Sequence, residues 1–173
     1  MKVRQLLLGL MICSVINGFS QFYQHEKGYG GEVIYNLPIG EFGFGARMNY
    51  HFSDYLIVSP QISFFPGFNQ LQELNGGLNI MFDVNPYNDL GFYLTAGAHL
   101  NWWMNYESSP LPDAKAMNFN PDFGAGMMWN YNCIRPFAEY RVSVKWWESN
   151  VRVGIMWYPF SCGDGIVCPA YYP

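Results

Sequence analysis

The chain has 173 residues, of which 9 are basic, 13 are acidic and 50% are hydrophobic, and only 13% carry a charge. That charged fraction is about half the value typical of a soluble domain. The 18 glycines, 11 prolines and 19% aromatic residues argue against a helical bundle and against disorder. The length suits one domain. Because basic residues are few and the net charge is acidic, we expect no nucleic-acid partner.

The first twenty residues have the layout of a secretory signal peptide. Lys2 and Arg4 precede an apolar run that ends at Ile16, and small residues precede a cut before Gln21. The apolar run is too short to cross a membrane as a helix, which needs about 20 residues. The chain is therefore expected to be exported.

The rest of the chain alternates between apolar and polar residues with a period of two. Between residues 42 and 52, Phe42, Phe44 and Met48 occupy even positions, whereas Arg47 and His51 occupy odd positions. Such alternation predicts a strand with two different faces. The pattern recurs along the chain, most clearly at 90–103 and 136–146. Strands are predicted at 29–37, 42–52, 56–64, 73–82, 90–103, 119–131, 136–146 and 151–158.

Eight consecutive strands, an even number, suit a closed up-and-down barrel in a membrane. One register of each strand is uncharged and suits lipid. The other carries glycine, asparagine, serine and nearly balanced charges, which suit a narrow interior where buried charges must pair. We therefore predict an all-β fold, an eight-stranded antiparallel transmembrane barrel of the bacterial outer membrane. The predicted division is a signal peptide at 1–20, the barrel at 21–160 and a short cysteine-containing tail at 161–173.

The inward register predicts a polar network that holds the strands together. An acid and a base could be assembled from it, but an eight-stranded interior is filled by its own side chains. The sequence contains no nucleophile elbow, phosphate loop or paired metal motif, so we expect no enzymatic activity, no cofactor and no metal. The predicted network consists of Glu32, Arg47, His51, Glu73, His99, Asp122, Glu139, Arg141, Lys145 and Arg152.

Aromatic residues gather at the ends of the predicted strands, as in the interfacial girdles of membrane barrels. Connections after even-numbered strands are short and should be periplasmic, whereas the longest connection, 105–118, is polar and should face outward. Contacts with lipid are expected everywhere on the apolar face, and contacts with other envelope proteins through this loop or the tail. The predicted girdle tryptophans are Trp102, Trp103, Trp129, Trp146, Trp147 and Trp157.

Three cysteines lie at or near the expected inner end of the barrel. Cys162 and Cys168 in the tail are close enough in sequence for a small disulfide loop in an exported protein. Cys133 falls in a predicted periplasmic turn, so a bond from Cys133 to either tail cysteine is the alternative. A metal site built from these cysteines would have no recognisable spacing.

Several runs resemble a known family. The segments YNLPIGEFGFGARMNYHFSD, LGFYLTAGAHLNWW and IRPFAEYRVSV resemble the small outer-membrane barrel proteins of the OmpA and OmpX type, in the form abundant in Bacteroidota. The resemblance implies an eight-stranded barrel without a wide pore, which in some members is an accessory subunit of a larger assembly. Such barrels usually end on an aromatic residue, whereas here Trp157 and Tyr158 precede Pro159 and the tail.

These observations favour a non-enzymatic integral outer-membrane protein, a structural or accessory component of the cell envelope. Two alternatives remain open. The first is a narrow transport channel or a subunit of a larger translocon or secretion complex. The second is a soluble lipocalin-like barrel that binds a ligand in its interior.

Overall fold

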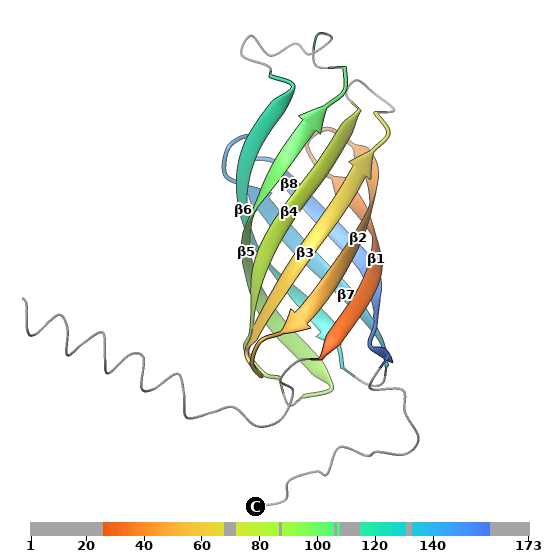
Figure 1. Cartoon of the computed structure of the whole chain (residues 1–173), viewed down its shortest axis with the longest axis vertical. Coiled ribbons are helices and arrows are strands. Elements are labelled where there is room, and N and C mark those ends of the chain that lie inside the picture. The colour runs from red at the N-terminus through yellow and green to blue at the C-terminus, as the bar shows by residue number, and fades with distance from the viewer. Residues whose placement is uncertain are drawn as a thin grey trace, which may run out of the picture.

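A computed structural model shows eight antiparallel strands that close into a barrel (Figure 1). The structure describes residues 26–67, 72–86, 88–105, 107, 115–130 and 133–159. The predicted signal peptide 1–20 and the tail 161–173, with Cys162 and Cys168, lie outside these residues. The strands are β1 Lys27–Asn36, β2 Glu41–His51, β3 Leu56–Phe65, β4 Glu73–Asp83, β5 Leu90–Trp103, β6 Met117–Trp129, β7 Ile134–Ser143 and β8 Ser149–Trp157.

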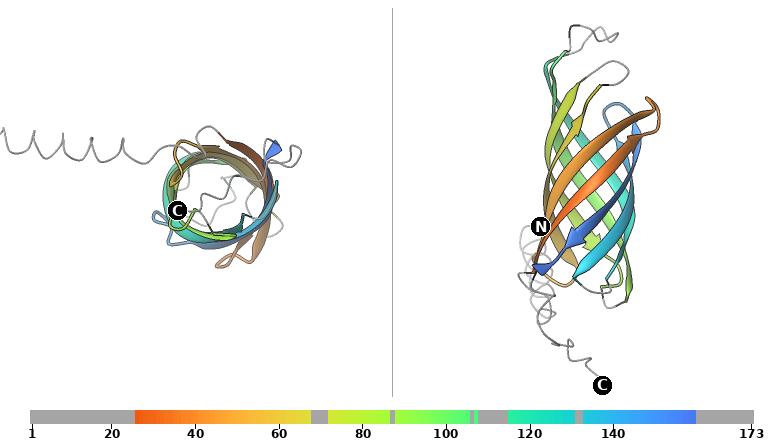
Figure 2. Two further views of the ribbon diagram at one scale, coloured as in Figure 1. Left: turned by 90° about the horizontal axis from the view of Figure 1, so that it is seen from below. Right: turned by 90° about the vertical axis from the view of Figure 1, so that its right-hand side faces the viewer.

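Every strand pairs with its neighbours in sequence, and β1 pairs with β8 to close the sheet, as the end-on view in Figure 2 shows. The predicted all-β fold and strand order are therefore confirmed. No helix in the described ranges is long and apolar enough to cross a membrane.

The largest error in a predicted strand end is at β7. β7 stops at Ser143 rather than at residue 146, because the chain turns there: the Ser143 N–H donates to Glu148 and the Val144 N–H donates to Pro121. Trp147 then adopts a left-handed backbone with a φ of 53°. Few side chains favour this conformation, and alternation of residue types does not reveal it. The connection from β5 to β6 also ends earlier than predicted, since β6 begins at Met117.

The two faces of the barrel differ sharply in polarity. Apart from Lys27 at the inner end of β1, the outward-facing strand positions carry no charged side chain, and large apolar residues such as Leu78 (53% exposed) are open to the surroundings. Charged and amide side chains are buried inside. A soluble lipocalin-like barrel would have the opposite arrangement, because its apolar face would line the interior.

The interior changes in character along the barrel axis. Toward the inner end, where β1 begins and β8 ends in Figure 1, it is filled by an apolar cluster. Farther out it becomes ionic. Inward-facing glycines make space for the larger residues: a Cβ atom at Gly77 would overlap the imidazole of His99 on the paired strand. The apolar cluster consists of Ile57, Met81, Tyr93, Met128, Phe137, Met156 and Tyr158.

The outward face can be tested with a charge placed midway along a strand. We expect Leu78→Arg in β4 to destabilise the barrel by about 2–4 kcal/mol in lipid vesicles, because the guanidinium would enter hydrocarbon. Leu37→Arg, in the turn after β1 and 45% exposed, is the control and should cost about 0–1 kcal/mol. Urea titration followed by tryptophan fluorescence measures both, and equal effects would contradict the predicted orientation.

Candidate functional site

The centre of the barrel is occupied by ion pairs that cross it from wall to wall. Arg47 on β2 reaches Glu139 on β7, with 3.0 Å between Nη1 and Oε2, and also pairs with Glu32 on β1. Arg152 on β8 binds the other oxygen of Glu32 at 3.0 Å. All of these side chains are almost completely shielded from solvent. The pairs therefore lie in the interior of the barrel and connect its opposite walls.

The same network continues through Glu139. Its carboxylate also binds Arg141 on the same strand and accepts a hydrogen bond of 2.9 Å from the Tyr93 hydroxyl on β5. Arg141 lies 3.6 Å from Asp122 on β6, and Asp122 lies 2.9 Å from Nδ1 of His99. The network thus passes from one wall to the other without a break.

Two amides extend the network to the remaining strands. Gln61 on β3 and Asn79 on β4 both contact Nε2 of His99. As a result, every strand of the barrel contributes at least one buried polar side chain to a single connected set. We call this set the central network. Its members are Glu32, Arg47, Gln61, Asn79, Tyr93, His99, Asp122, Glu139, Arg141 and Arg152.

The charges of the central network balance. Its three arginines face three carboxylates, and the guanidinium of Arg47 also stacks on Phe137, 4.3 Å from the ring centroid. Pairing matters here because an isolated buried charge costs several kcal/mol. Each charged group of the central network therefore lies beside at least one group of opposite charge.

The predicted inward residues divide into three groups. The central network contains Glu32, Arg47, His99, Asp122, Glu139, Arg141 and Arg152. His51 lies toward the inner end beside Tyr158, and Glu73 lies at the outer end beside Asn101. The prediction was wrong for Lys145, which is exposed in the turn after β7 and bonds Asn118. The early end of β7 explains this difference.

The predicted girdle tryptophans also divide. Trp102, Trp129 and Trp157 are exposed on the outward face of their strands, and Trp147 is 75% exposed in the outer turn. Trp103 was predicted wrongly: it is 5% exposed and points inward. Neighbouring residues of a strand face opposite sides, so Trp102 and Trp103 cannot both face outward. Trp103 instead stacks on the half-buried Trp146, with ring centroids 5.8 Å apart.

The inner mouth holds residues that the sequence did not identify as a group. Tyr158, just after β8, is fully buried, and its hydroxyl accepts a hydrogen bond of 3.2 Å from Asn49. The guanidinium of Arg135 covers the Tyr158 ring at 4.0 Å and pairs with Glu26 at 3.2 Å. The predicted strand 151–158 includes Tyr158, and alternation from the outward Trp157 places it inside, but the pattern did not indicate its contacts with Asn49 and Arg135.

Cys133 lies next to this cluster, and its carbonyl accepts the Tyr158 N–H at 2.7 Å. Cys133 is disulfide-bonded. The two cysteines that the sequence offered as partners, Cys162 and Cys168, lie outside the described residues.

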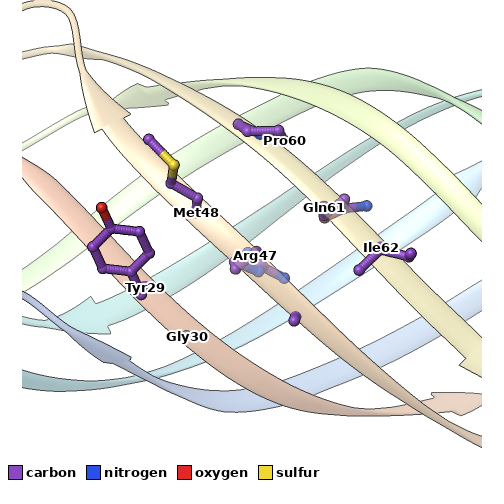
Figure 3. Close-up of a pocket in the computed structure, with 8 residues that line it drawn as sticks. Tyr29, Gly30, Arg47, Met48, Pro60, Gln61 and Ile62 are labelled. Carbon is purple, nitrogen blue, oxygen red and sulfur yellow. The ribbon is translucent and has the colours of Figure 1, made fainter.

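The outward surface carries a shallow groove of about 420 Å³ over β1, β2 and β3 (Figure 3). Its lining is mostly apolar, and includes Tyr29, Met48 and Ile62 around the small residues Gly30 and Ala46. The pairing between β2 and β3 is interrupted beside it, between Arg47–Gln61 and Tyr50–Val58. Proline at position 60, which lacks a backbone N–H, lies in this gap.

No group of three or more histidine, cysteine, aspartate or glutamate side chains within the described residues is arranged to hold a metal ion. Comparison with known proteins adds the fold but no activity. No family model matches the chain, and no curated protein matches it.

Several solved structures share the architecture. The N-terminal β-barrel domain of OprF from Pseudomonas aeruginosa covers 78% of this chain and 97% of its own, with a TM-score of 0.62 and 13% identity. A de novo designed transmembrane β-barrel covers 80% and 98%, with a TM-score of 0.54 and 21% identity. The outer membrane protein Ail of Yersinia pestis, in a phospholipid nanodisc, covers 78% and 99%, with a TM-score of 0.50 and 15% identity.

The chain has the fold of an eight-stranded transmembrane barrel. Identities this low show the fold alone.

The importance of charge pairing can be measured at Glu139. We expect Glu139→Gln to lower the free energy of unfolding by about 3–5 kcal/mol, because Arg47 and Arg141 would keep buried charges without their shared partner. Glu107→Gln, which removes a carboxylate from an exposed outer loop, is the matched control and should change stability by about 0.5 kcal/mol or less. Similar losses in the two variants would show that the network contributes little.

Proposed function

We propose that this protein is a non-enzymatic integral barrel of the bacterial outer membrane, a structural or accessory component of the cell envelope. Its uncharged outward face supports a location in lipid, because no polar coat covers the exposed apolar side chains. The shared fold with OprF and Ail supports the same membrane. So does the resemblance to small barrels of the OmpA and OmpX type in the form abundant in Bacteroidota.

The observation that carries this proposal is the closed interior. Charged side chains bridge β2 and β7 through the middle of the lumen, and an apolar cluster fills the space beneath them. A water-filled pathway would require these paired charges to separate inside the barrel. Because separation of a buried pair is costly, the resting protein is expected to be non-conducting.

The same observation argues against catalysis. The only described histidine in the central network, His99, is engaged by Asp122, Gln61 and Asn79. Lipid is the partner that the outward face suits. Other envelope proteins would contact the barrel through the outer connection at 105–118 or through the tail at 161–173. Much of the connection and all of the tail lie outside the described residues.

Single-channel recording tests the proposal against its main alternative. Purified protein inserted into planar lipid bilayers should give no steady current, and a wide porin inserted under the same conditions serves as the positive control. Insertion should be verified independently by protease protection of the reconstituted barrel. Steady open currents from correctly inserted protein would overturn the structural role and favour a narrow transport channel.

A further inference from the structure

The outward face of the described strands carries one charged side chain, Lys27, at the inner end of β1. Lys27 forms no ion pair within the described residues. The strand register places it beside Tyr50 on β2, and places Tyr29, the next outward residue of β1, beside Trp157 on β8. Tyrosine, tryptophan and lysine gather where the apolar core of a membrane meets the headgroups. This group of residues therefore marks the level of the headgroups at the inner end of the barrel.

The groove over β1, β2 and β3 begins one row deeper in the wall than Lys27. Tyr29 pairs with Met48, and the register on either side of the interrupted pairing puts Met48 opposite Pro60 (Figure 3). Outward side chains of one strand are two residues apart, which corresponds to about 7 Å along the strand. The ammonium of Lys27 and the groove therefore follow one another along the same strands.

The groove is hollow because large side chains are missing from the row beyond Met48. Gly31 and Ala46 are paired there, and both are exposed on the outward face. A Cβ atom at Gly31 would approach only a carbonyl oxygen, 3.9 Å away. Ile62 pairs with Ala46 and is 52% exposed. The small residues thus leave a depression, of about 420 Å³, between larger apolar side chains.

The groove offers no charged side chain of its own to a ligand. Arg47 and Gln61 also border it, but both residues are buried and their side chains belong to the central network. Because burying a polar group without a hydrogen bond is costly, the part of a ligand that enters the groove should be hydrocarbon. The site therefore combines an apolar depression with a cation at its inner edge.

We propose that Lys27 and this groove bind one anionic glycerophospholipid. Its phosphate pairs with the Lys27 ammonium, and one of its acyl chains lies over Gly31 and Ala46. A phospholipid carries a negative headgroup next to an apolar chain, in the same order in which Lys27 and the groove follow one another. The lipid belongs to the periplasmic leaflet, since the lengths of the connections predict that the inner end is periplasmic. This inference rests on the proposed location of the barrel in the outer membrane.

A second copy of the barrel fits this surface less well. The end-on view in Figure 2 shows a rounded wall, so another barrel would approach the groove with a convex surface. Two convex walls touch along a narrow line and would leave the depression unfilled, whereas a single acyl chain can enter it. A second copy also offers no charge for Lys27 on its outward face, because the described strands carry no outward carboxylate.

Native mass spectrometry of the intact protein tests the inference. The protein is first folded into vesicles of phosphatidylcholine, and protease protection establishes that it has inserted. It is then transferred to an uncharged detergent and titrated with phosphatidylglycerol. We expect one phosphatidylglycerol molecule to be retained at saturation. Phosphatidylcholine with the same acyl chains but no net charge should bind about fivefold more weakly, the effect expected for one interfacial lysine.

Two variants, each with a matched control, probe the two halves of the site. Lys27→Gln should weaken phosphatidylglycerol binding about fivefold, whereas Lys115→Gln, which removes an equal charge from the exposed segment before β6, should bind like the wild type. Ala46→Phe fills the groove and should weaken binding about tenfold, as when about two methylene groups lose their contact with the protein. Ala96→Phe, at an exposed outward position of β5, is its control and should have no effect. The heat-dependent shift of each variant on a denaturing gel checks its folding.

The outcomes separate this inference from the proposed function. Failure of the wild type to insert would overturn both. An inserted and folded barrel that retains no phosphatidylglycerol would overturn the inference alone, as would equal losses of affinity within either matched pair. A dimer free of lipid that Ala46→Phe dissociates would assign the groove to a second copy and would also overturn it.

Discussion

The closed barrel depends on keeping three arginines paired with three carboxylates whose side chains are almost completely buried. Backbone hydrogen bonds join each strand only to its neighbours, whereas the contact between Arg47 and Glu139 joins β2 to β7 across the lumen. The contact between Glu32 and Arg152 lies on the seam where β1 meets β8. Ion pairs therefore add contacts across the lumen and at the seam between β1 and β8, beyond the backbone pairing of neighbouring strands.

The residues that fill the interior differ from one end of the barrel to the other. Its inner end is filled by the apolar cluster and capped by Tyr158 beneath the Arg135 guanidinium, and its middle is filled by the central network. At the outer end, Glu73 and Glu148 accept hydrogen bonds from Asn101 and Asn36, and neither forms an ion pair within the described residues.

The sequence predicted the fold because a period of two assigns each side chain to one face. Arg47, Glu139 and Arg152 were predicted to face inward on this basis alone, and the structure places them there. The sequence could not predict which of them meet, since Arg47 and Glu139 are separated by 92 positions and their contact depends on the stagger between strands. The sequence did not predict Gln61 and Asn79 as members of the network for the same reason, because their contacts with His99 also depend on the stagger between strands.

Errors arose at strand ends, where the alternation stops, and where an aromatic residue was assigned by its type rather than by its position in the alternation. Trp103 was assigned to a girdle as an aromatic residue near a strand end, although its neighbour Trp102 already occupied the outward face. Lys145 was predicted to face inward because the strand was extended to residue 146, whereas β7 ends at Ser143. The left-handed backbone of Trp147 lies in the turn that follows. Alternation in the predicted strand 151–158 places Tyr158 inward, but it could not show that Arg135 and Asn49, from other strands, contact it.

A double-mutant cycle on Arg47→Met and Glu139→Gln in lipid vesicles tests the central claim most directly, because it isolates the energy of the contact that crosses the lumen. The account predicts a coupling energy of about 1–3 kcal/mol between the two changes. Effects that simply add, to within about 0.5 kcal/mol, would show that the two groups do not depend on each other and would contradict it.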